Sequence, residues 1–239
     1  MAPTGRVKAS PTRDLARKRA KAPRGEEKRR NGRGRPAAGE DDVGRESLLA
    51  VTREILRTTP PETVTRLMIA RKANVDPGLI RYYFGTVSHL IAEVVVGTHL
   101  RIRESVLDIV ATREPVEALR TRLGLLIDLF IEYPFHHRLI RQVMYGADSK
   151  SEHAEWIVSL RSSVEETAAL IDMGVQENIF RAVDPRLLQL ALIGVAEFFG
   201  GNAEIVHDVF ERKETIFTMR DRYVDFLAEL FLHGLYKRD

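Results

Sequence analysis

The segment TRLMIARKANVDPGLIRYYF, residues 65–84, holds the side chains best suited to bind a nucleic acid. Arg81 and Tyr82 are neighbours near its end, and a guanidinium can pair with a phosphate or bind the edge of a guanine through two hydrogen bonds. Thr65 and Arg66 stand where a helix would begin, and the N–H groups at a helix N-terminus bind phosphate readily. The chemistry predicted for this segment is contact with DNA.

Local signals predict two short helices joined by a tight turn here. Thr65 can cap the first helix, and Asn74 tolerates the left-handed conformation needed where that helix ends. Asp76 can cap the second helix, with Pro77 in the first helical position. This spacing is typical of a helix-turn-helix, whose second helix enters the major groove and presents its first turn to the base edges. The expected DNA contacts are Thr65, Arg66, Pro77, Gly78, Leu79, Arg81 and Tyr82.

A strongly basic segment precedes this unit. Residues 1–45 contain 14 Lys and Arg against 6 Asp and Glu, a net charge of +8, whereas the remaining residues hold 23 basic and 28 acidic groups, a net charge of −5. Because these 45 residues include few large apolar side chains, they are expected to form a disordered basic arm. Within it, Arg33-Gly34-Arg35-Pro36 resembles the AT-hook of minor-groove binders. Two interpretations stay open: minor-groove contact by Arg33 and Arg35, or a solvated tail with nonspecific charge.

Several classes of protein are excluded or disfavoured. The chain has no cysteine, which excludes disulfides, thiolate catalysis and cysteine-based metal sites. No apolar run approaches the roughly 18 residues that span a bilayer, so we expect a cytoplasmic protein without a membrane segment. No nucleophile elbow, phosphate loop or paired-carboxylate motif indicates an enzyme or a cofactor. His136-His137 suggests a metal, but adjacent helical residues do not face each other, so no metal site is expected.

Helical periodicity continues through the rest of the chain and predicts an all-α fold. After Asp184-Pro185 a helix with almost no polar face begins, and such a helix must be covered on more than one side. The last helix also carries a wide apolar stripe. A second copy of the chain is the expected cover for both, which predicts a homodimer. The expected helices begin at Glu46 and then span about 65–73, 77–84, 88–110, 115–133, 135–145, 152–176, from 185 onward, and 214–236.

Residues 67–90 resemble the DNA-binding signature of the TetR family of bacterial transcriptional regulators. The resemblance is carried by Ile69-Ala70, Ala73-Asn74-Val75, the run from Gly78 to Phe84, and Leu90. It implies an all-helical dimer. Its parts would be a three-helix helix-turn-helix domain at 46–92 and a helical ligand-binding and dimerisation domain at 93–239, preceded by the arm at 1–45. The two C-terminal helices would form the dimer interface.

The chain departs from the family pattern at three places. Asn74 stands where the family usually has Gly, and Arg81 occupies a position commonly filled by Tyr. Thr86-Val87-Ser88 replaces the usual Ser-Lys-Glu, so the Lys that normally binds phosphate is missing. The basic arm is then an attractive compensating contact with DNA.

These observations predict a dimeric DNA-binding transcriptional regulator, a repressor released from a palindromic operator by an unidentified small-molecule effector. The alternative is an architectural DNA-binding protein of low specificity, dominated by the basic arm. The resemblance places the ligand pocket among the middle helices, where large or polar residues interrupt apolar stretches. The pocket candidates are Phe130, Tyr133, His137, Arg138, Met144, Trp156 and Arg161.

Overall fold

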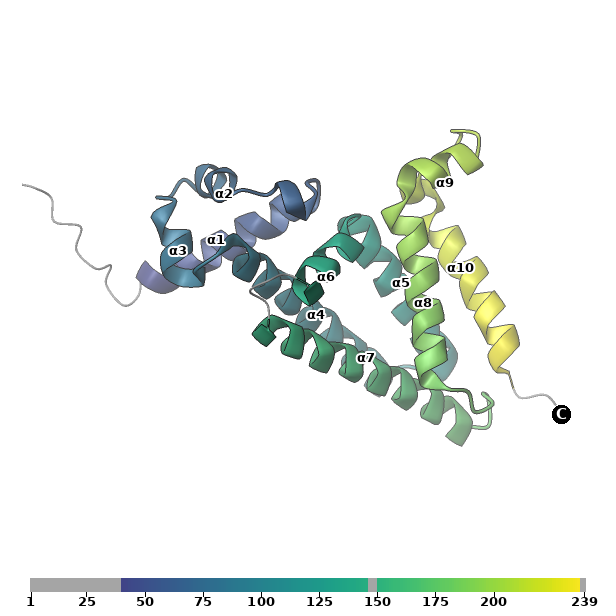
Figure 1. Ribbon diagram of the computed structural model, residues 1–239. Helices are drawn as coiled ribbons and strands as arrows, with labels where there is room; N and C mark the ends of the chain where they lie inside the picture. Colours follow the sequence, from purple (N-terminus) through teal and green to yellow (C-terminus); the bar gives the residue numbers. More distant parts are fainter. Residues whose placement is uncertain (1–39, 146–149, 237–239) are drawn as a thin grey trace, which may run out of the picture. The chain divides into compact units, whose positions relative to one another are not determined.

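The computed structural model describes residues 40–145 and 150–236, and these residues form ten α-helices and one short 3-10 helix (Figure 1). The predicted all-α fold is confirmed. The predicted groove contacts Arg33 and Arg35 lie outside the described residues. The helices are α1 (Glu40–Leu56), η1 (Pro61–Thr63), α2 (Arg66–Ala73), α3 (Gly78–Phe84), α4 (Val87–Thr112), α5 (Pro115–Glu132), α6 (His136–Tyr145), α7 (Lys150–Gln176), α8 (Pro185–Gly201), α9 (Ala203–Val209) and α10 (Ile216–Leu235).

The first helix begins earlier than the sequence predicted, at Glu40 instead of Glu46. Long-range contacts hold its N-terminal part. Arg45 forms an ion pair with Glu93 of α4, and its guanidinium lies 5.1 Å from the centroid of the Phe84 ring. Residues 40–45, assigned to the arm on composition, belong to α1, and Arg45 among them has partners far along the chain.

The predicted helix-turn-helix geometry is confirmed over residues 65–84. The Thr65 hydroxyl accepts a hydrogen bond from the Met68 N–H at 3.2 Å and caps α2. Asn74 ends α2 in the left-handed conformation, at φ 54° and ψ 44°. The Asp76 carboxylate then accepts a bond from the Gly78 N–H at 2.7 Å, with Pro77 already in a helical conformation. These caps set the turn between the two helices.

A continuous apolar cluster joins the helix-turn-helix to the helices behind it. Ile69, Ile80 and Phe84 are buried together with Leu90 and Ile91 from the first turns of α4. The same cluster continues into α5, α6 and α7. The helix-turn-helix therefore rests on these helices through a shared core. The cluster members from α5, α6 and α7 are Leu129, Tyr133, Leu139, Val143 and Trp156.

A second apolar cluster holds together α5, α7, α8 and α10. Gly200 of α8 lies so close to α5 that a Cβ atom there would stand 2.5 Å from the carbonyl carbon of Phe130. Phe199 of α8 stacks on Tyr223 of α10 with ring centroids 4.2 Å apart, so these two helices lie side by side. The short helix α9 between them was not expected from the sequence pattern.

Within the described ranges, no single helix is long and apolar enough to cross a membrane. Among the described helices, one pair, α3 with residues Val87–Ile109 of α4, reaches that length and composition together, and this pair is bent by 59°. Ile80, Leu90 and Ile91 of that pair are buried in the protein core.

Candidate DNA-binding face and ligand cavity

The predicted DNA contacts lie at the start of α2 and in α3 or just before it. Thr65, Arg66, Gly78 and Arg81 are exposed, and Pro77 and Leu79 are partly exposed. Tyr82 is 58% exposed and packs edge-on against Tyr83 with ring centroids 4.9 Å apart. Large polar side chains this open to solvent are available to phosphates and base edges.

Two exposed apolar residues of α2 were not among the expected contacts. Leu67 and Met68 follow Arg66 in the first turn of α2, and both are exposed. Only Ile69 and Ala70 of this helix are buried. A short amphipathic helix has an ambiguous phase, and tertiary packing selects the buried side.

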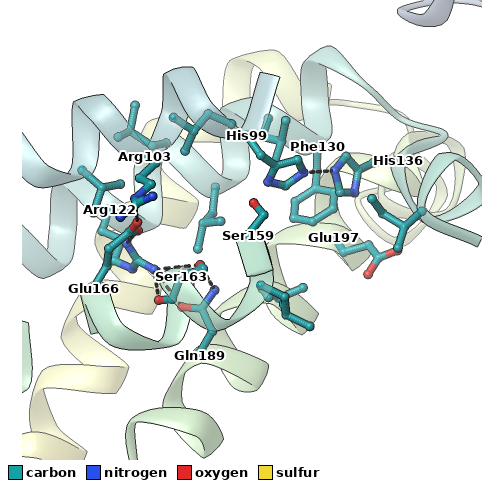
Figure 2. A pocket seen from close by; sticks show the side chains of 18 of the residues that line it. His99, Arg103, Arg122, Phe130, His136, Ser159, Ser163, Glu166, Gln189 and Glu197 are labelled. Atoms are coloured by element: carbon teal, nitrogen blue, oxygen red, sulfur yellow. Dashed lines mark hydrogen bonds and ion pairs between the residues drawn. The ribbon is translucent and has the colours of Figure 1, made fainter. Parts of the chain in front are cut away.

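The described helices enclose a cavity of about 280 Å³ bounded by α4, α5, α6, α7 and α8 (Figure 2). This volume is close to the lower end of the range for small-molecule sites. About half of its lining residues are apolar, and the polar ones other than Ser159 gather at two places. The apolar lining consists of Ile102, Val106, Leu125, Leu126, Leu129, Phe130, Ile140, Trp156, Leu160 and Ile193.

Three of the seven predicted pocket residues line this cavity: Phe130, His137 and Trp156. The other four, Tyr133, Arg138, Met144 and Arg161, lie elsewhere. A helix buries several faces against different neighbours, so large or polar residues in an apolar stretch need not face the same cavity.

Each of these four residues has another role or place. Tyr133 is buried in the cluster beneath the helix-turn-helix, and burial raises its pKa. Arg138 reaches away from the cavity to Glu62 of η1, at 2.7 Å. Met144 packs against the same cluster, and Arg161 is exposed on α7.

A polar network forms one end of the cavity around Arg122, whose surface is only 2% exposed. Its guanidinium donates to Glu166 at 3.3 Å, to the Ser163 carbonyl at 3.0 Å and to Gln189 at 2.9 Å. Arg103 of α4 approaches the other oxygen of Glu166 at 3.4 Å. Burial lowers the pKa of Arg122 and raises that of Glu166, and the ion pair between them opposes both shifts.

Two imidazoles form the other end of the cavity. His99 and His136 approach through their Nε2 atoms at 2.9 Å, so one donates and the other accepts. Burial lowers the pKa of His99 to about 4 and that of His136 well below its usual value. Both rings are therefore neutral near pH 7. Trp156 lies edge-on to His99 with ring centroids 4.5 Å apart.

A carboxylate lies near this second end. Glu197 of α8 is 3.8 Å from Nδ1 of His137. Within the part of the chain that the structure describes, no three side chains of metal-ligating type converge. The histidine end can donate and accept hydrogen bonds, and its only carboxylate is that of Glu197.

Sequence reasoning missed most of the polar lining. Gln189 lies between Leu188 and Leu190 in a strongly apolar run, and a polar residue flanked by leucines is a usable signal. Arg122 follows Arg120 and Thr121, so its local sequence does not mark it out. His99, Ser163 and Glu166 gave no such signal, because their own helices are amphipathic and carry many polar residues. Their convergence depends on how α4, α5, α7 and α8 pack.

An exposed apolar stripe runs along α8 and α10. Leu187, Leu190 and Phe198 of α8 are each more than half exposed. Phe217, Phe226 and Leu230 show the same on α10. Apolar patches of this kind mark interaction surfaces in soluble proteins. The homodimer expected through these helices stays a prediction.

The C-terminal part of the chain matches a family model. The model describes the tetracyclin repressor-like C-terminal domain, and it matches residues 112–238. A comparison with the curated proteins finds no significant match.

Solved structures share the fold across most of the chain. A TetR transcription regulator from Haloarcula marismortui superposes with a TM-score of 0.62 at 19% identity, covering 82% of this chain and 100% of that one. A proposed transcriptional regulator from Saccharomonospora viridis, in complex with choline, gives 0.60 at 16% identity, with 82% and 100% covered. FadR from Bacillus subtilis, in complex with stearoyl-CoA, gives 0.56 at 13% identity, with 77% and 97% covered.

Proposed function

This chain belongs to the TetR family of transcriptional regulators, a family without enzymatic activity, and from that premise we propose that it is a homodimeric repressor. It binds a palindromic operator through α3 of each subunit. A small molecule in the cavity then releases it from DNA. Two relatives of the same fold carry small molecules in their structures, choline in one and stearoyl-CoA in the other.

The observation that carries the proposal is the position of α6 between the cavity and the helix-turn-helix. His136, His137 and Ile140 of this helix line the cavity. Leu139 and Val143, on another face, belong to the apolar cluster of the helix-turn-helix. A ligand that moves α6 therefore acts on the support of the DNA-binding unit.

Two polar contacts strengthen this connection. Arg138 of α6 pairs with Glu62 of η1, and Gln142 of α6 donates to Ser88 at the start of α4 at 3.4 Å. A ligand-induced shift of α6 would displace η1 and the start of α4 through these two contacts. The separation of the two recognition helices in the dimer would then no longer match the operator half-sites.

The DNA-binding part of the proposal rests on the exposed face of α3. Arg81 and Tyr82 are exposed; Arg81 would bind phosphate or guanine, and Tyr82 would bind phosphate. The homodimer part rests on the apolar stripe of α8 and α10, whose side chains would be covered by the same stripe of a second copy. A twofold axis there pairs two α3 helices with two half-sites.

The test is a selection of bound fragments from genomic DNA, followed by fluorescence anisotropy on the selected site at several salt concentrations. The wild-type protein should select a palindrome and bind it in a salt-dependent way. Arg81→Ala should cost about 1–3 kcal/mol of binding free energy. Arg101→Ala, on the exposed side of α4, is the matched control and should bind as the wild type does.

The second candidate function is an architectural DNA-binding role, which the net charge of +8 in residues 1–45 supports. Deleting residues 1–39 separates the two, because the deletion leaves α1 intact. A repressor should keep its preference for the palindrome with weaker affinity. The architectural role would be supported by two results together: the full chain shows no preference for any DNA sequence, and the shortened chain loses nearly all DNA binding.

A further inference from the structure

The cavity is built with unlike ends, and we propose that its ligand is an elongated, mostly apolar molecule with a carboxylate that binds at the Arg103–Arg122 end. The inference deepens the proposed function, since it takes this cavity to be the effector site. It concerns the chemical class of the effector, and it can be tested without DNA.

The first argument is the balance of charge at that end. Arg103 and Arg122 bring two guanidinium groups, and both make ion pairs with the single carboxylate of Glu166. Glu166 is only 7% exposed. One positive charge is thus left without a partner in the cavity lining, and a buried or half-buried charge gains most from a partner of opposite sign. Glu165 is nearby, but it is exposed and does not line the cavity.

Hydrogen-bonding capacity at this end points the same way. Among the described residues Nε of Arg122 is buried and has no hydrogen-bond partner. Arg103 contacts Glu166 through its Nε, and its side chain is about half exposed at the edge of the cavity. The terminal nitrogens of Arg103 can therefore turn to a carboxylate without breaking the Arg122–Glu166 pair. Guanidinium–carboxylate bonds are the strongest that such a site offers.

The second argument is the contrast between the two ends, which Figure 2 shows on opposite sides of the cavity. Arg122 and Phe130 lie eight residues apart on α5, which is about 12 Å along the helix axis. Gln189 and Glu197 are separated equally on α8. The far end has neutral imidazoles and the carboxylate of Glu197, so an anionic group is disfavoured there.

The surface between the ends is mostly apolar, with Ser159 as a polar residue between them (Figure 2). Leu126 of α5 and Ile193 of α8 lie midway between the two polar ends, and Leu160 of α7 adds to this section. An alkyl or alicyclic body gains free energy by leaving water for such a surface. One charged head, an apolar body and room of about 12 Å along the helix axes describe an amphipathic carboxylate.

The chain has a built-in reporter for the test. Trp156 is the only tryptophan of the sequence and lines the cavity, so its fluorescence reports occupancy directly. Octanoate, decanoate and dodecanoate would be titrated into the full-length protein below their micellar concentrations. Matched alcohols and alkyltrimethylammonium ions of the same chain lengths would be titrated in parallel. The best carboxylate should bind at least about tenfold more tightly than the alcohol of equal length.

Variants test whether the preference for carboxylate arises at the Arg103–Arg122 end. Arg103→Gln should reduce the preference for carboxylate over alcohol to about twofold or less, whereas Arg103→Lys, which keeps the charge, should retain most of it. Arg101→Gln makes the same change on the exposed side of α4 and should leave the ratio as in the wild type. Circular dichroism melts confirm that each variant is folded.

Three outcomes would overturn the proposal: equal affinity for carboxylate and alcohol, tighter binding of the alkyltrimethylammonium ion, or a carboxylate preference that survives in Arg103→Gln. Absence of any fluorescence change with all the carboxylates would also overturn it. Each of these can occur while operator binding is intact, so failure here is distinguishable from failure of the repressor proposal.

Discussion

His99 of α4 and His136 of α6 meet through their Nε2 atoms, 2.9 Å apart, at the end of the cavity nearest the helix-turn-helix cluster. α4 carries the helix-turn-helix at its N-terminal end, and Leu139 and Val143 of α6 belong to the apolar cluster that includes the helix-turn-helix. A single N–H···N hydrogen bond thus joins the two helices that connect the cavity to the DNA-binding face. Protonation of both rings would break this contact.

Stability should consequently fall as the pH drops. Burial lowers the pKa of His99 from 6.5 to about 4, so the unfolded chain takes up the proton first. The stability from the neutral pair is present above about pH 6.5 and is lost as the pH falls toward about 4, an effect on the order of 2–3 kcal/mol. Urea unfolding across this range measures it. The double variant His99→Gln, His136→Gln should show a flatter pH dependence, and an unchanged slope would contradict the assignment.

The Arg138–Glu62 ion pair should transmit the ligand signal while contributing little to stability. Both side chains are about half exposed, and exposed pairs are weakly stabilising. Arg138→Gln should therefore leave the melting temperature nearly unchanged and reduce the loss of operator affinity that a cavity ligand causes. Combining it with Glu62→Gln in a double-mutant cycle isolates the pair. Full ligand response in every variant would show that α6 does not act through this contact.

Close packing between α8 and α5 makes Gly200 intolerant of a side chain. A Cβ atom there would stand 2.5 Å from the carbonyl carbon of Phe130, and backbone cannot yield as a side-chain end can. Gly200→Ala should lower the free energy of unfolding by about 1–3 kcal/mol. Gly97 of α4 is the control, since a Cβ there meets nothing within 4 Å. Gly97→Ala should stabilise by about 0.5–1 kcal/mol in the same denaturant titration.

The turn of the helix-turn-helix depends on the left-handed conformation of Asn74, at φ 54°. A β-branched residue is strained there, so Asn74→Val should cost about 1–2 kcal/mol. Asn74→Gly adopts this conformation freely and should match the wild type within about 0.5 kcal/mol, because relief of strain offsets the added entropy of the unfolded chain. Thermal unfolding compares the two, and equal losses would mean that the backbone conformation is not the cause.

The proposed dimer should come apart when a charge enters the apolar stripe. Leu190 is 66% exposed on α8, and Leu190→Glu would bury a carboxylate in the interface. Light scattering coupled to size-exclusion chromatography should show a dimer for the wild type and a monomer for this variant. Leu107→Glu places the same charge on an exposed position of α4 and should remain dimeric. A monomeric wild-type protein would refute the interface.

The sequence by itself determined the helix-turn-helix. Thr65, Asn74 and Asp76 act through backbone conformation or hydrogen bonds to residues only two or three positions away, so their effects are written in the local order of residue types. The same holds for Pro115 and Pro185, which start α5 and α8 where the sequence predicted. The apolar periodicity of the long helices likewise predicted an all-α chain.

Only the tertiary structure determined which residues line the cavity and where α1 begins. Arg122, Glu166 and Gln189 come from three different helices, and their hydrogen bonds exist because those helices pack at one particular register. Arg45 likewise orders the start of α1 through Glu93, far along the chain. Periodicity shows that a helix has a buried side, but which neighbour covers that side is a non-local property. The physical reason is that the free energy of burying a polar group depends on the partner it meets, and that partner is set by packing.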